Sequence, residues 1–108
     1  MRSDEITQLI EQGESLHVAF ARRISPAYIN ERRVIETMAC LANAEGGSLL
    51  IGVDSDGIVS GCYPFHGDRT DPAALAADIF RQTSPGLPVD VTVAEIGGRE
   101  VVAIHAQA

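Results

Sequence analysis

The stretch LANAEGGSLLIGVDSDGIVSG, residues 41–61, decides the fold of this chain. It opens with the end of a helix, and the glycine pair 46–47 predicts the helix stop because glycine readily adopts left-handed backbone conformations. The run 48–53 is almost wholly apolar, which predicts a central strand that is buried on both faces. The letters DSDG at 54–57 are typical of a hairpin turn, so we expect a return strand from Ile58.

Capping residues and apolar periodicity predict three helices. The first is expected to start with Ser3 as N-cap and to stop at Gly13. The second is long and starts at either Ser25 or Asn30, and the third starts with Asp71 as N-cap. The residues expected on the buried faces are Val34, Ile35, Met38, Leu41 and Ala42 in the second helix, and Leu75, Ile79 and Phe80 in the third.

Alternating apolar residues predict the remaining strands at 16–20, 89–93 and 101–105, with a glycine pair at 97–98 as the turn of a second hairpin. The element order is therefore α-β-α-β-β-α-β-β. This order predicts an α+β fold, in which three helices pack on a mixed, largely antiparallel sheet of about five strands. Residues 1–108 are expected to form a single domain, either complete or cut from a longer regulator.

The composition restricts what this chain can bind. Its net charge of −7 repels nucleic acid and anionic membranes at long range, so any phosphate must be bound by a local patch. No apolar run approaches the ~18 residues of a membrane span, and the acidic N-terminus does not fit a signal peptide, so we expect a cytoplasmic protein. Cys40 and Cys62 are expected to be small buried residues, since no metal-ligand spacing is present.

The positive charges are all arginines, and half of them lie close together in the sequence. We call Arg22, Arg23, Arg32 and Arg33 the arginine group. Guanidinium groups bind phosphate with two parallel hydrogen bonds, which favours a nucleic-acid contact patch. The alternative is a solvated surface on which Glu36 pairs with Arg32 four residues earlier. The residues alone leave both interpretations open.

Two motifs together carry a family resemblance. Glu14 and Ser15 are followed by a short strand that ends in Phe20, and the stretch 41–61 comes later in the chain. Within that stretch the matching residues are Asn43, Gly46, Gly47, Leu50, Ile51, Gly52, Val53, Asp54, Gly57 and Gly61. This combination resembles the Schlafen/AlbA-like DNA-binding domain, which in bacteria usually begins longer transcriptional regulators.

The clustered arginines together with this resemblance predict a non-catalytic domain of a transcriptional regulator that binds nucleic acid, DNA more than RNA, through the arginine group. A homodimer would double this patch. Some members of the family are RNases that hold a metal with acidic residues, but Ala19 and Ala21 replace the Glu and Lys of the family motif. We therefore expect Glu14 and Asp54 to be a vestigial metal site, with no metal, no cofactor and no catalytic residue.

Two other functions remain open. One is a protein–protein interaction or dimerisation module without nucleic-acid binding, in which an exposed strand at 101–105 pairs with a partner. The weaker one is a metal-dependent RNase, which Ala19 argues against. ATP binding of the Walker type is not expected, because the glycine-rich segment precedes a strand and the chain contains no lysine.

Overall fold

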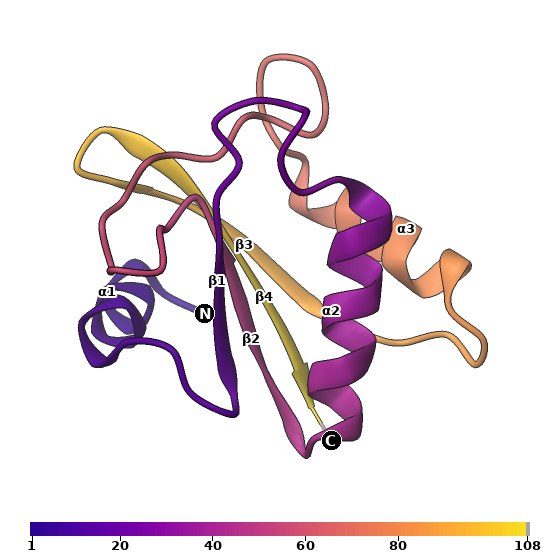
Figure 1. Ribbon diagram of the computed structural model, residues 1–108. Helices are drawn as coiled ribbons and strands as arrows, with labels where there is room; N and C mark the ends of the chain where they lie inside the picture. Colours follow the sequence, from indigo (N-terminus) through magenta and orange to yellow (C-terminus); the bar gives the residue numbers. More distant parts are fainter. Residues whose placement is uncertain (108) are drawn as a thin grey trace.

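The computed structural model describes residues 1–107, which form three helices and a four-stranded sheet (Figure 1). The elements are α1 (Ser3–Gln12), β1 (Val18–Ala21), α2 (Glu31–Asn43), β2 (Gly46–Ile51), α3 (Pro72–Gln82), β3 (Asp90–Ile96) and β4 (Arg99–Gln107). The strand order is β1-β2-β4-β3, with β1 parallel to β2 and the other pairs antiparallel. The predicted α+β fold with a mixed sheet is confirmed.

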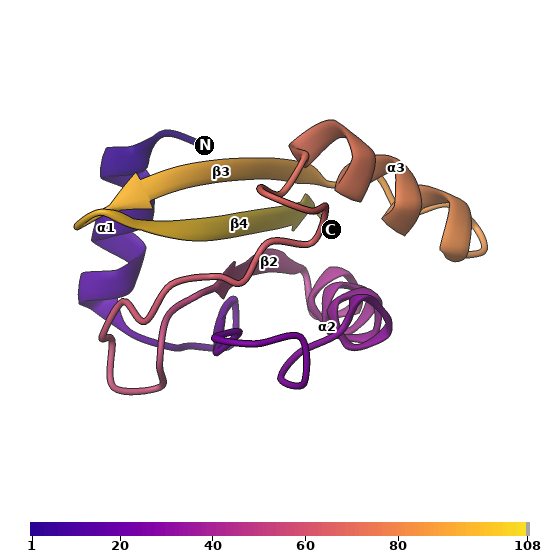
Figure 2. The same cartoon turned by 90° about the horizontal axis from the view of Figure 1, so that it is seen from above.

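The sheet separates two apolar cores. Figure 2 shows α1 at one side of the molecule and α2 and α3 at the other. The core beneath α2 and α3 includes Val34, Met38, Leu41, Leu75 and Ile79 from the helices and Leu49, Ile51, Val102 and Ile104 from the sheet. On the opposite face Ile6 of α1 packs with Leu50 and Val101. Successive side chains of a strand point to opposite faces, and both faces of β2 are covered by a core. Every residue of β2 is therefore buried. The predicted central strand is therefore confirmed.

The sheet has four strands, and the prediction of about five is wrong. The turn at 54–57 forms, with Gly57 at a φ of 85° and its N–H bonded to the Asp54 carbonyl. After the turn, however, the chain pairs only through isolated bridges, Val59 with Val53 and Cys62 with Arg23, and Ile58 is 60% exposed. A return strand cannot pair with β2, because β1 and β4 occupy both of its edges.

The segment 101–105 belongs to β4, which lies between β2 and β3. Its backbone groups pair with both neighbours, so the expectation that it is an exposed strand edge is wrong. The edges of the sheet are β1 and β3. Any pairing with a partner strand would have to use one of these two.

Capping residues begin two helices as the sequence predicts. Asn30 accepts a backbone N–H of the first turn of α2, which selects it over Ser25 as the start of that helix. Asp71 caps α3 in the same way. The first helix differs by one residue, because Arg2 rather than Ser3 has the extended backbone of the N-cap. None of the described helices is long and apolar enough to cross a membrane.

The helix α2 ends just before the glycine pair, but the left-handed residue after its C-cap Ala44 is Glu45, at a φ of 75°, so the prediction that the glycines stop the helix is wrong. The glycines begin β2 and let two strands approach. Gly46 has a φ of 91°, which a side chain would strain. A Cβ at Gly47 would lie 2.4 Å from the carbonyl oxygen of His17, just before β1. Glycine at this position therefore permits the parallel pairing of β1 with β2.

Three residues predicted to be buried lie at the surface. Leu16 is 84% exposed, because β1 starts only at Val18 and the preceding residues form a turn. Phe80 is 51% exposed and turns its ring toward Gly86 in the loop after α3. Cys40 lies on the solvent side of α2.

Candidate functional site

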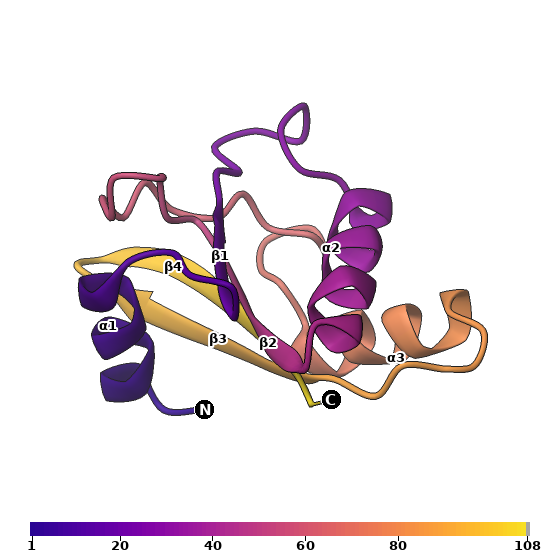
Figure 3. The same cartoon turned by 60° about the horizontal axis from the view of Figure 1, so that its bottom comes forward.

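In the arginine group, Arg22 and Arg23 open loop 22–30, which follows β1, and Arg32 and Arg33 lie in the first turn of α2. This loop lies at the end of the molecule away from both termini (Figure 3). The four guanidinium groups have different environments, because Arg23 is buried while Arg22, Arg32 and Arg33 are exposed. The structure therefore divides the group into one internal residue and three surface residues.

Arg23 is an internal anchor, which corrects the expectation that it contacts phosphate. It is 6% exposed, and its Nε donates to the Tyr63 carbonyl at 2.8 Å. Its Nη1 donates to the Ile29 carbonyl, and its Cζ lies 3.8 Å from the centre of the Phe65 ring. Burial lowers the pKa of this guanidinium, while the neighbouring Cys62 and Tyr63 act in the opposite direction. Arg23 therefore joins two loops and is not available to a ligand.

Arg22 is half-exposed and makes two local contacts. Its Nε lies 3.1 Å from Asp54 Oδ1, in an ion pair that joins the end of β1 to the turn after β2. This oxygen is buried, and it makes no hydrogen bond within the described residues. The Arg22 Cζ lies 5.5 Å from the centre of the Tyr28 ring, within the range of a cation–π contact. The guanidinium is thus held over an aromatic ring at the protein surface.

Arg32 and Arg33 differ although they are adjacent. Arg32 pairs with Glu36 at 3.4 Å across one helical turn, and its side chain is 88% exposed. This is the solvated ion pair of the alternative interpretation. Arg33 is exposed and makes no ion pair within residues 1–107. Helix stability does not explain Arg33, since cations are disfavoured in the first turn of a helix.

An open cavity of about 400 Å³ brings Arg22 and Arg33 together. Tyr28, Ile29 and Val53 also line it, so its wall combines two arginine side chains with a tyrosine and apolar residues. We call this hollow the arginine cavity. Its chemistry suits an anionic ligand that also carries a flat or apolar group.

The two acidic residues of the expected vestigial metal site have other partners. Glu14 Oε1 accepts the backbone N–H of Phe20 at 2.8 Å, along the outer edge of β1. Asp54 forms the ion pair with Arg22. Ala19 points into the core beneath α2, where it packs beside buried apolar residues. Among the described residues, no three His, Cys, Asp or Glu side chains lie close enough together to hold a metal.

The two cysteines have opposite environments. Cys62 is 6% exposed, as predicted, and burial raises the pKa of its thiol to about 12, with a smaller contribution from Glu100. It is therefore protonated at neutral pH and is a poor nucleophile. Cys40 is exposed on α2, and both thiols are free.

Sequence reasoning missed the tyrosines that accompany the arginines. Tyr28 and Tyr63 are 47% and 45% exposed, and each lies within 6 Å of an arginine guanidinium carbon. Tyr28 could have been found, because an aromatic residue between two arginine pairs is typical of nucleic-acid surfaces. Tyr63 could not, because 40 residues separate it from Arg23 and only the fold brings them together.

Comparisons with known proteins place the chain in a family. No curated protein sequence matches it. The DIP2311 protein from Corynebacterium diphtheriae has a similar structure, with a TM-score of 0.67 and 20% identity over 97% of this chain, which spans 22% of that chain. The N-terminal domain of a Nitrosomonas europaea protein, named as related to the ATP-dependent DNA helicase RecG, has a TM-score of 0.60. It is 25% identical over 99% of this chain and 74% of its own. The family model described as Schlafen, AlbA_2 matches residues 14–108, and the chain therefore belongs to this family.

Proposed function

We propose that this chain is a non-catalytic nucleic-acid-binding domain that contacts backbone phosphate through Arg22, Arg32 and Arg33. The observation that carries the proposal is the arginine cavity, in which Arg22 and Arg33 meet although different elements supply them. Membership of the Schlafen, AlbA_2 family and the similarity to a domain named after a DNA helicase support nucleic acid as the ligand. We further propose that DNA is preferred, and that the chain serves in a transcriptional regulator.

The charges of the site predict weak binding that depends on salt. Each phosphate contact releases counterions from the nucleic acid, so affinity falls as salt rises. The acidic remainder of the chain opposes association at long range. The ion pair of Arg32 is no obstacle, because an exposed pair contributes about 0–1 kcal/mol and can be exchanged for phosphate. Contacts of this kind position a protein but carry little sequence information.

The non-catalytic part of the proposal is supported by the partners of the acidic residues. The Glu14 carboxylate binds a backbone N–H, and Asp54 is paired with a cation. With Ala19 packed in the core, a divalent metal would have to displace both interactions and still lack a third carboxylate.

The test is a fluorescence-polarisation titration with labelled single-stranded DNA, duplex DNA and RNA, at about 50 mM and about 150 mM salt. We expect micromolar binding at the lower salt. The variant R22A/R33A should bind at least tenfold more weakly, with a salt dependence shallower by about two units because two phosphate contacts are lost.

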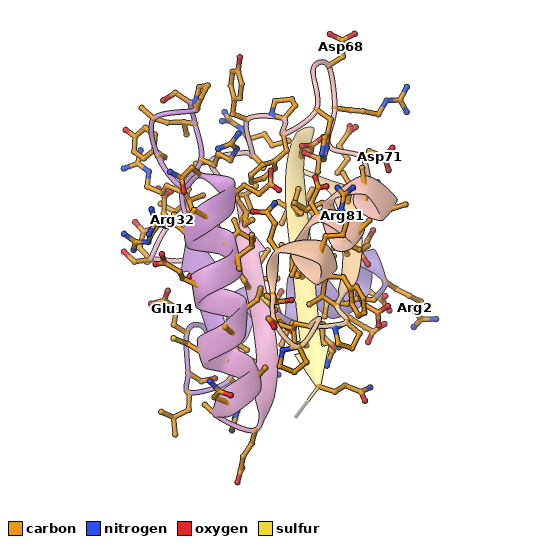
Figure 4. The ribbon with its side chains drawn as sticks, turned by 90° about the vertical axis from the view of Figure 1, so that its right-hand side faces the viewer. Arg2, Glu14, Arg32, Asp68, Asp71 and Arg81 are labelled. Carbon is orange, nitrogen blue, oxygen red and sulfur yellow. The ribbon has the colours of Figure 1, made fainter. Side chains whose placement is uncertain are left out.

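The matched control is R2A/R81A, which removes the same charge. Arg2 and Arg81 also pair with neighbouring carboxylates, and Figure 4 shows Arg2 on the side of the molecule opposite Arg32. The control should bind within about threefold of the parent, since it changes only the long-range field. If the parent binds none of the probes at low salt, or if both double variants lose the same affinity, the proposal fails. The protein–protein interaction module would then be the better account.

A further inference from the structure

The two tyrosines lie on adjoining loops. Tyr28 belongs to loop 22–30, and Tyr63 belongs to the segment that follows the turn at 54–57. The two segments run side by side, since Arg23 bridges to Cys62 in parallel register and the Tyr63 N–H donates to the Arg23 carbonyl. Figure 1 shows both segments beyond the end of β1.

The buried Arg23 side chain fixes the backbone of loop 22–30 and of the segment that carries Tyr63. One guanidinium donates to the carbonyl of Ile29, the neighbour of Tyr28, and to the carbonyl of Tyr63 itself. Its charge is stacked on Phe65, so the anchor is internal. The backbone that carries each tyrosine is therefore fixed before any ligand arrives, which lowers the entropic cost of binding.

The exposed rings are not explained by the core. Both tyrosines are close to half-exposed, and Ile24, which is 45% exposed, lines the same surface hollow as Tyr63. Tyr28 lies beside the exposed Arg22, and Tyr63 shares its hollow with the exposed Arg99. Tyrosines with exposed arginines nearby match the recurring design of single-strand binders, in which bases stack on aromatic faces and cations follow the backbone. A duplex cannot use such rings in this way, because its base faces are already stacked within the helix.

We propose that Tyr28 and Tyr63 are stacking platforms for unpaired bases, so that the ligand of this surface is single-stranded nucleic acid. The inference rests on the proposed function, because the arginine cavity supplies the phosphate contacts. It adds the class of ligand and assigns two residues to base contact. DNA and RNA share this chemistry, so the experiment includes a strand of each.

The chain provides its own reporter for the test. It contains two tyrosines and no tryptophan, so its intrinsic emission comes from Tyr28 and Tyr63 alone. A base stacked on a tyrosine quenches that emission. The probes are an oligothymidylate of about 15 nucleotides, an oligouridylate and an abasic DNA strand of the same length, and a DNA duplex. The abasic strand retains the phosphates and lacks the bases, which separates stacking from charge.

Oligothymidylate or oligouridylate should quench the emission as it saturates the polarisation signal, and the abasic strand should not. The more tightly bound of the two identifies the sugar preference. Y28A and Y63A should each bind the base-containing strand about tenfold more weakly, and Y63A, which lies outside the arginine cavity, should keep its affinity for duplex within about twofold. Y28F and Y63F retain an aromatic face, so they should bind within about twofold of the parent and leave a single emitting residue that is still quenched.

The outcomes separate this inference from the function on which it rests. Binding without quenching, or equal affinity for abasic and base-containing strands, overturns the inference and leaves the phosphate contacts of Arg22 and Arg33 in place. Failure of every probe to bind overturns both. The Phe variants and the abasic strand give this answer even if an Ala variant does not fold.

Discussion

Arg23 shows how a single residue can carry charge without binding a ligand. Its guanidinium satisfies two backbone carbonyls and covers the Phe65 ring. We predict that R23A lowers the free energy of unfolding by about 2–4 kcal/mol, because two carbonyls lose their donor and a cavity forms beneath the loops. Urea denaturation followed by circular dichroism measures this change.

R33A is the control for that experiment, since Arg33 is exposed and unpaired among residues 1–107. Its unfolding free energy should stay within about 0.5 kcal/mol of the parent. R23K should recover only part of the loss, because an ammonium group cannot reproduce the planar contacts of a guanidinium. An R23A protein as stable as R33A would contradict the anchoring role.

At the residue scale, the sequence predicts features that depend on neighbouring residues, such as helix caps. It does not predict features that depend on contacts between distant parts of the chain. Asp71 could be identified, and Asn30 could be named as one of two candidates, because a helix cap depends on neighbours within one turn. The four arginines could be grouped by position, but their environments could not be distinguished. Arg23 is buried by Phe65 and Tyr63, which are about 40 residues away and reach it only through the fold.

At the scale of elements, β1 is an edge strand whose outer side is closed by its own preceding residues. The Glu14 carboxylate accepts the Phe20 N–H, and Ser15 exchanges backbone hydrogen bonds with Val18. Unpaired edges promote association between chains, so this segment protects the sheet. The Glu-Ser motif therefore has a structural role that requires no metal.

We predict that E14A lowers the free energy of unfolding by about 1 kcal/mol, because the Phe20 N–H loses its acceptor. E14Q retains an acceptor oxygen and should lose less than half of that amount. Urea denaturation measures both, and Mg²⁺ or Mn²⁺ should leave the parent's midpoint unchanged. A midpoint that rises with either ion in the parent and not in E14Q would instead support a working metal site.

Sequence periodicity predicted all three helices and four of the five expected strands, since each presents an apolar face over several residues. It could not limit the strand count, because a turn sequence says nothing about which strand edges are free. The return segment 58–61 after the turn at 54–57 pairs only with residues 52–54 and adds no strand to the sheet, because β1 and β4 already flank β2. Strand order depends on the whole sheet and cannot be predicted from the turn sequence at 54–57.

At the scale of the molecule, an acidic chain can bind a polyanion where its positive charges lie together. The net charge is −7, yet Arg22 and Arg33 converge on one cavity beside Tyr28. The fold places this cavity where β1 ends and α2 begins, away from both termini (Figure 3). The distribution of charge thus matters more than its sum.

An NMR titration tests this claim most directly. Amide signals of the isotope-labelled chain would be followed as an oligothymidylate is added at low salt. We predict that the shifts concentrate in residues 22–33 and around Tyr63, and that β3 and the C-terminal end of β4 do not move. Shifts centred elsewhere, such as the hollow lined by His17, Ser48 and His105, would contradict the account, and so would a spectrum that does not change.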